Sequence, residues 1–144
     1  MKKSLLILAI IITAMIFSIC SILIKQNNTL EQVKKKNSEY ELYLGKALLG
    51  TDITTIINKA VDQNEKNKVP KDEEGYYIEN DTNSIKIEIE MITIEKTYPM
   101  EAFYKKGMTS FVENFNVIEF KCTGIEYHKK TGLISKIKFK QLDY

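Results

Sequence analysis

The chain has 144 residues, with 21 lysines, no arginine, 19 acidic residues, one histidine and two cysteines. This length holds one modest domain with appendages and excludes two full hydrophobic cores. Arginine supplies the planar fork that recognises guanine and phosphate in bidentate fashion, so its absence argues against base-specific nucleic-acid binding. Residues 37–144 carry more acidic residues than lysines, which also disfavours a polyanionic partner.

Residues 5–24 form the first predicted element, an uncharged apolar run that follows the basic N-terminus at residues 1–4. At ~1.5 Å rise per residue, a helix of this length reaches about 30 Å, the thickness of a bilayer core. We therefore predict a transmembrane helix from Leu5 to Ile24, with the lipid bilayer as its partner.

A cleaved signal peptide is the alternative for this segment, because a basic start precedes the apolar run. The run exceeds the roughly 7 to 15 residues of a signal-peptide core. The one small-x-small candidate, Ser18-Ile19-Cys20, is still followed by apolar residues, and Ile19 is too bulky for a lipoprotein signal. An uncleaved signal anchor is favoured.

The orientation of the anchor in the membrane is harder to predict from charge than its position in the sequence. Lysines stand on both sides of the run, at Lys2 and Lys3 before it and at Lys25 and Lys34–Lys36 after it. Long domains cross the membrane largely regardless of charge, and a short basic segment normally leads a signal anchor. We predict a C-terminal domain outside the cytoplasm, with an inward-facing domain as the alternative.

Residues 25–39 are polar and predict a stalk or an extension of the membrane helix. The Lys34–Lys36 run is typical of a solvated face, and contact with anionic lipid headgroups is the alternative. A soluble domain is predicted from residue 40 to residue 144. Its first element is a second helical segment that starts at Tyr40 and that Gly50 ends.

A clear amphipathic helix is predicted over Asp52–Asn64. Apolar residues recur at helical spacing and form one stripe, at Ile53, Ile56, Ile57, Ala60 and Val61. Thr51 or Asp52 would cap the first amide groups, and Asp52 would also suit the positive end of the helix dipole. We expect Asp52 to be a helix cap and not a reactive group.

The remaining pattern alternates between strands and short helices. After a charged loop, the strands Tyr76–Ile78 and Ile85–Ile94 predict a hairpin around turn-forming residues 79–84. Residues 100–115 predict one or two short helices, and Val117–Leu142 predicts a second hairpin. Together these elements predict an α+β domain with helices packed on a four-stranded, mainly antiparallel sheet, one face of which Asp52–Asn64 covers.

The candidate catalytic residues are too far apart to react together. Cys122 and His128 lie six residues apart on one predicted strand, about 20 Å at ~3.3 Å per residue. We expect Cys122 to be buried and His128 to be exposed at the hairpin end. Cys20, inside the predicted anchor, cannot pair with Cys122, so no intramolecular disulfide is predicted.

Metal and cofactor patterns are also missing from the sequence. The acidic residues Asp72, Glu73, Glu74 and Asp81 lack the alternating ligands and glycine of an EF-hand loop, although weak calcium binding stays open. No glycine-rich phosphate loop is present. We predict no catalytic residue, no metal, no cofactor and no small-molecule substrate.

Three segments carry a family resemblance: "GTDITTIINKAVDQNEKN", "GYYIENDTNSIKIEI" and "FKCTGIEYHKKTG". They resemble uncharacterised short single-pass membrane-anchored proteins of low-G+C Gram-positive bacteria, which implies an anchor and a small head but no particular activity. A long apolar helix before a helix-and-sheet head is also similar to type IV pilin-like proteins. The chain departs from them in having neither Gly-Phe nor Ala-Phe before the apolar run and no Glu at its fifth position.

The function that these features favour is a non-enzymatic, membrane-anchored extracytoplasmic domain that binds another envelope protein or supports an envelope complex. A pilin-like or secretion-filament subunit and an inward-facing regulatory domain are the alternatives. Most aromatic side chains of the soluble domain are expected to pack in its core or at its rim. A protein-binding patch formed by a minority of them is the alternative, because tyrosine is enriched at interfaces. The candidates are Tyr40, Tyr43, Tyr76, Tyr77, Tyr98, Phe103, Tyr104 and Tyr127.

Overall fold

The computed structural model describes residues 2–143 and separates the chain into two compact units, Met1–Lys36 and Asn37–Tyr144. We call the second unit the head. The helices are α1 (Lys2–Glu41), α2 (Gly50–Lys66), η1 (Ile92–Ile94), α3 (Met100–Lys106) and α4 (Met108–Phe115). The strands are β1 (Ala47–Leu49), β2 (Lys86–Met91), β3 (Lys96–Pro99), β4 (Glu119–Tyr127) and β5 (Ile134–Gln141).

Helix α1 is a single helix of 40 residues that includes the whole predicted transmembrane segment. Its segment Ile10–Glu41 is long and apolar enough to cross a membrane, judged by length and composition. Large apolar side chains along it are exposed, such as Phe17 at 76%. Residues 25–39 continue the same helix, so of the two predicted forms the helix extension is observed.

The head is built on a five-stranded mixed sheet with the order β1-β4-β5-β2-β3. Strands β2 and β5 run parallel, with Ile87 beside Ile137 and Ile89 beside Phe139, while the other neighbours are antiparallel. The α+β class is confirmed. The predicted number of strands, four, is wrong, whereas the mainly antiparallel character is confirmed, because only the β2–β5 pair is parallel.

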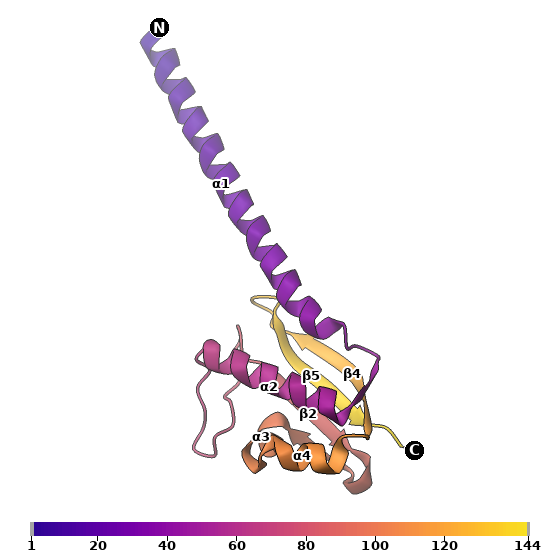
Figure 1. The fold of residues 1–144 in the computed structure, drawn as a ribbon. Coiled ribbons are helices and arrows are strands. Elements are labelled where there is room, and N and C mark those ends of the chain that lie inside the picture. The colour runs from indigo at the N-terminus through magenta and orange to yellow at the C-terminus, as the bar shows by residue number, and fades with distance from the viewer. Residues whose placement is uncertain (1, 144) are drawn as a thin grey trace. The chain divides into compact units, whose positions relative to one another are not determined.

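Helix α2 carries the predicted stripe, and its five apolar residues are buried. It contacts β1, β2 and β4, and Figure 1 shows it lying across one face of the sheet. The two short helices and the second hairpin, β4 with β5, are confirmed. Burying each large aliphatic side chain of this stripe stabilises the head by about 1.5–3 kcal/mol.

The predicted helical segment between Tyr40 and Gly50 is wrong. Helix α1 ends at Glu41, the chain turns at Gly45 with a φ of 75°, and Ala47–Leu49 form β1 against Glu119–Lys121 of β4. Gly50 begins α2 instead of ending a helix. A short apolar run is compatible with both a strand and a helix, because it is too short to show a period. Here the run forms a strand because it pairs with the edge of β4.

The predicted first hairpin is also wrong. Tyr77 makes only an isolated bridge with Lys71, and β2 pairs with β3 and β5 instead. The Oδ1 atom of Asn80 accepts the N–H groups of residues 82, 83 and 84 at 2.8–3.1 Å, which closes the loop on itself. Glu95, with a φ of 47°, then turns the chain from η1 into β3.

The sheet face that α2 leaves uncovered is charged. Outward side chains of β5 pair with carboxylates of its neighbours: Lys136 with Glu88 at 3.1 Å and Lys138 with Glu126 at 2.5 Å. Lys140 pairs with Glu90 at 2.8 Å. The head therefore has a buried apolar face under the helices and an opposite face whose charges largely neutralise each other.

Candidate functional site

An aromatic cluster forms where β3, α3 and α4 meet, and it consists of Tyr98, Phe103, Phe111, Phe115 and Phe120. Ring centroids are 5.7 Å apart for Tyr98 and Phe103, and 4.8 Å apart for Phe103 and Phe111, both in edge-to-face geometry. The Phe111 and Phe115 centroids lie 5.0 Å apart. Such ring pairs add about 0.5–1.5 kcal/mol each beyond burial of their area.

Gly107 gives the cluster its shape by separating α3 from α4. Its φ of 85° and ψ of 124° interrupt the helix between Lys106 and Met108. Residues with a side chain rarely adopt a positive φ of this kind, whereas glycine does so without steric cost. The interruption brings Phe103 of α3 against Phe111 of α4.

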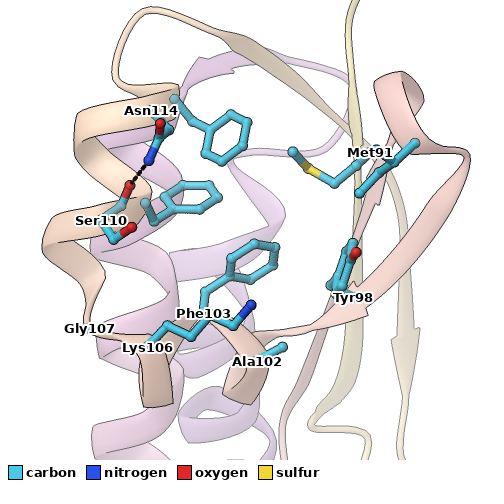
Figure 2. Close-up of a pocket in the computed structure, with 11 residues that line it drawn as sticks. Met91, Tyr98, Ala102, Phe103, Lys106, Gly107, Ser110 and Asn114 are labelled. Carbon is cyan, nitrogen blue, oxygen red and sulfur yellow. Dashed lines mark hydrogen bonds between the residues drawn. The ribbon is translucent and has the colours of Figure 1, made fainter.

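An open cavity of about 230 Å³ lies beside the cluster. Phe103, Phe111 and Phe115 contribute aromatic surface to it. Figure 2 shows Met91 and Tyr98 on one side, facing Ser110 and Asn114 of α4 on the other. We call this cavity the aromatic pocket; its remaining lining comes from Ile94, Ala102, Lys106 and Gly107.

The polar side of the aromatic pocket has few groups. The amide nitrogen of Asn114 donates to the Ser110 carbonyl at 2.7 Å, which leaves the Asn114 side-chain oxygen as an acceptor. Lys106 is the one charged side chain among the described residues that line the pocket, and it is exposed. The pocket is therefore apolar with one cationic edge.

A second, polar cavity of about 400 Å³ lies near the β4–β5 turn, and His128 is among its lining residues. The prediction that His128 is exposed is wrong, because only 7% of its surface is accessible. Its Nε2 donates to the Ser84 carbonyl at 2.7 Å, so the imidazole links the β4–β5 turn to the loop of residues 79–84. Asp81 on the same cavity pairs with Lys130 at 2.7 Å, which leaves little free charge there.

Cys122 is buried, as predicted, with 1% of its surface accessible. Burial raises the pKa of its thiol, and hydrogen bonds with the backbone at Gly124 and Gly45 only partly offset this. A raised pKa is the opposite of what a nucleophilic thiol needs. The sulfur lies 4.0 Å from the Gly124 carbonyl, while His128 is engaged with Ser84, so the two predicted candidates are not brought together.

Asp52 takes part in capping α2, as the sequence indicates, but it does so from the third helical position, because the N-cap residue is Leu49 and the helix begins at Gly50. Its Oδ2 accepts the N–H of Leu49 at 3.1 Å, across the first turn of the helix. The carboxylate therefore has a structural role at the first turn of the helix.

Two of the acidic loop residues, Asp72 and Asp81, act as turn and ion-pair partners. Asp72 Oδ1 accepts the N–H of Tyr76 at 2.8 Å, and Asp81 is held by Lys130. Within residues 2–143, no group of three or more histidine, cysteine or acidic side chains is placed to hold a metal ion.

Glu101 on α3 is a buried carboxylate that the sequence did not single out. It is 4% exposed, and its Oε1 accepts the Tyr77 N–H at 3.3 Å. Its Oε2 has no hydrogen-bond partner among the described residues. The side chain ties the segment around Tyr77 to α3 and does not line the aromatic pocket.

Sequence reasoning named Tyr98 and Phe103 among its interface candidates but missed the pocket itself. Phe111, Phe115 and Met91 were not connected to them. The available indication was an aromatic residue on each side of a glycine, at Phe103 and Phe111 around Gly107. No family model matches this sequence, and neither a curated protein nor a solved structure matches it significantly.

Proposed function

We propose that this chain is a single-pass membrane protein whose head lies outside the cytoplasm, binds another envelope protein and catalyses no reaction. The observation that carries the proposal is the aromatic pocket, an open apolar cavity of about 230 Å³ on the head. Aromatic side chains and methionine are enriched at protein interfaces, where a few of them contribute most of the binding energy. Helix α1 supplies the length and apolar character that an anchor needs.

The state of the reactive residues supports a binding role over catalysis. The Cys122 thiol is buried with a raised pKa, and the His128 imidazole is committed to the Ser84 carbonyl. Neither has the accessible, activated form that nucleophilic or general-base catalysis requires.

Orientation is tested with one introduced cysteine. Asp62 is exposed on α2, so Asp62→Cys in a chain with Cys20 and Cys122 replaced by serine and alanine places one accessible thiol on the head. We expect a membrane-impermeant maleimide to label it in intact cells. Labelling only after lysis would instead support an inward-facing regulatory domain. Total lysate labelling confirms that the thiol is reactive.

Partner binding is tested by photo-cross-linking in cells. A photoreactive residue at Ser110 stands at the aromatic pocket, and one at Thr123 stands on β4 outside it; both positions are exposed. We expect a second envelope protein to be captured from Ser110 and not from Thr123. Capture from neither position, or saturable turnover of a small substrate by the purified chain, would overturn the proposal.

A pilin-like or secretion-filament subunit is the second candidate. The observation that favours it is the single 40-residue α1, whose last residues belong to the head unit. A filament subunit would appear in sheared surface fractions with a processed N-terminus. An intact N-terminus by mass spectrometry, with the chain absent from those fractions, would remove this candidate.

A further inference from the structure

We infer that the aromatic pocket binds one aromatic side chain of the partner protein. A carboxylate on the neighbouring residue of the partner then pairs with Lys106. The inference rests on the proposed function, because it specifies what part of a partner the pocket recognises. Its supports are the size of the cavity, the chemistry of its walls and the charge at its edge.

The volume of the pocket matches a single ring. A cavity of roughly 150 Å³ in an apolar core binds benzene, and pockets for drug-sized molecules are about 300–1,000 Å³. The aromatic pocket, at about 230 Å³, lies between these two sizes. It is large enough for one aromatic side chain and small for a long acyl chain or a multi-ring ligand.

The walls suit an aromatic occupant. Phe103 contacts Tyr98 and Phe111 edge to face, so the cluster already uses the ring geometry that an incoming ring would extend. Met91 borders the same cavity, and thioether sulfur makes favourable contacts with ring edges. Ser110 and Asn114 add hydrogen-bonding groups on the facing side, where a peptide backbone would pass (Figure 2).

Lys106 adds a charge preference. Seven lysines of the head are paired with carboxylates, and Lys106 has no hydrogen bond or ion pair among the described residues. Figure 2 shows its side chain lying along the pocket on the same side as Phe103. An approaching carboxylate would therefore meet an unpaired cation, while a cationic residue there would be repelled.

The neighbouring Lys105 provides a matched control. Its ammonium group donates to the Glu74 carbonyl and lies 3.6 Å from the centre of the Tyr76 ring. It does not line the aromatic pocket. Two adjacent lysines of α3 thus differ in the property that matters here, which is access to the cavity.

The test uses the full chain in lipid nanodiscs with methyl-labelled methionine, so that Met91 reports on the pocket. The first probe is acetyl-Gly-Asp-Phe-Gly-amide. The others replace its Asp by Lys or its Phe by Ala. We expect a saturable shift of the Met91 methyl signal with the first probe, binding about three- to fivefold weaker with the lysine probe, since exposed charge pairs are of modest strength, and no saturable shift with the alanine probe.

Variants separate the two parts of the inference. Lys106→Gln should abolish the preference for the acidic probe and keep aromatic binding, while Lys105→Gln should leave the preference unchanged. Ala102→Leu, which adds volume inside the pocket, should abolish binding of both aromatic probes. Unchanged dispersion of the other methionine signals in each variant confirms that the head stays folded.

Several results would overturn the inference: equal binding of the acidic and lysine probes, an acid preference that survives in Lys106→Gln, or full binding by Ala102→Leu. If the Ser110 cross-linker captures a partner while no probe shifts the Met91 signal, the inference fails and the proposed function stands. If neither occurs, both fail.

Discussion

At the scale of single residues, two asparagines act as clamps on strand ends. Asn64 is fully buried, and its side chain both donates to the Ile85 carbonyl and accepts the Ile85 N–H, each at 2.8 Å. Asn37 donates to the Gly132 carbonyl at 2.7 Å and accepts the Ile134 N–H at 3.1 Å. A side-chain amide matches a backbone peptide group in both donor and acceptor, which is why asparagine suits both places.

Replacing Asn64 by leucine should destabilise the head strongly. The substitution leaves the buried N–H and carbonyl of Ile85 without partners, at a cost of about 2–6 kcal/mol for the two groups. Urea unfolding monitored by circular dichroism measures this loss. Asn58→Leu, on the exposed side of α2, is the control and should change the free energy of unfolding by about 0.5 kcal/mol or less. Equal effects of the two substitutions would contradict the clamp.

Gly50 has a role that the sequence did not reveal. A Cβ at this position would lie 2.0 Å from the Phe115 carbonyl oxygen, because the start of α2 meets the end of α4 there. Its own N–H donates to the Ile118 carbonyl at 3.0 Å. The glycine is required by this close approach of two backbones.

Gly50→Ala should therefore lower the free energy of unfolding by about 1–3 kcal/mol or more, the usual cost of overpacking. The neighbouring Thr51→Ala, at an exposed position, should have little effect. Thermal unfolding of the two variants side by side makes the comparison. A Gly50→Ala head as stable as the parent would show that α2 and α4 can separate without cost.

At the scale of elements, ion pairs link β2, β4 and β5 with the loops around them. Hydrogen bonds from Lys138, Lys86 and Lys130 hold the pKa values of their carboxylate partners below the ordinary values of 4.5 for Glu and 3.8 for Asp. The carboxylates concerned are those of Glu126, Glu79 and Asp81.

These lowered pKa values predict how stability changes in acid. A carboxylate with a lower pKa in the folded state stabilises the fold above its unfolded pKa and loses that contribution as the pH falls through its folded pKa. The free energy of unfolding should be level from pH 7 to about 5 and fall below about 4.5. Urea titrations at several pH values test this. Lys138→Gln should reduce the decrease, and a stability that rises on acidification would contradict the assignment.

The elements that the sequence predicted are those with many periodic positions. The five-residue stripe of α2 and the strands of the β4–β5 hairpin each have enough residues to reveal a period. Strand β1 has three residues and β3 has four, too few to do so. Tyr76–Ile78 has the residue types of a strand, yet the Asn80 side chain closes the following loop by local hydrogen bonds. Strand β2 therefore pairs with β3 and with β5, and β5 lies fifty residues further along the chain.

The aromatic pocket was predictable only in part, for a similar reason. Tyr98 and Phe103 were recognised as candidates because aromatic residues are common in interfaces. The cavity depends on the break between α3 and α4 at Gly107, and on η1, which brings Ile94 to the same place. Neither the angle of a helix break nor the position of a short turn follows from hydrophobic periodicity.

At the scale of the whole molecule, the contact boundary lies between Lys36 and Asn37, three residues before the start expected from the sequence. The last residues of α1 are structural parts of the head. Tyr40 is 2% exposed, and its hydroxyl donates to Gln63 at 3.3 Å. Glu41 accepts the Tyr127 hydroxyl at 2.8 Å.

The head should therefore need these residues to fold stably. A fragment of residues 37–144 should unfold cooperatively, whereas one of residues 42–144, which lacks Asn37 and Tyr40, should lose about 3 kcal/mol or more, as expected for deleting a buried aromatic side chain. Calorimetry on both fragments provides the measurement, with Tyr40→Ala in the longer fragment as an intermediate case. Identical unfolding temperatures would show that the end of α1 contributes nothing.

The place of β5 in the sheet governs when the head folds during synthesis. It is the middle strand of five, and it alone joins the β1–β4 pair to the β2–β3 pair. It also follows the other four strands in chain order, from Ile134 to Gln141. Without β5, neither β4 nor β2 has its central neighbour, and strands with open edges are prone to aggregation. The five-stranded sheet of the head can therefore be completed only after β5 has been translated.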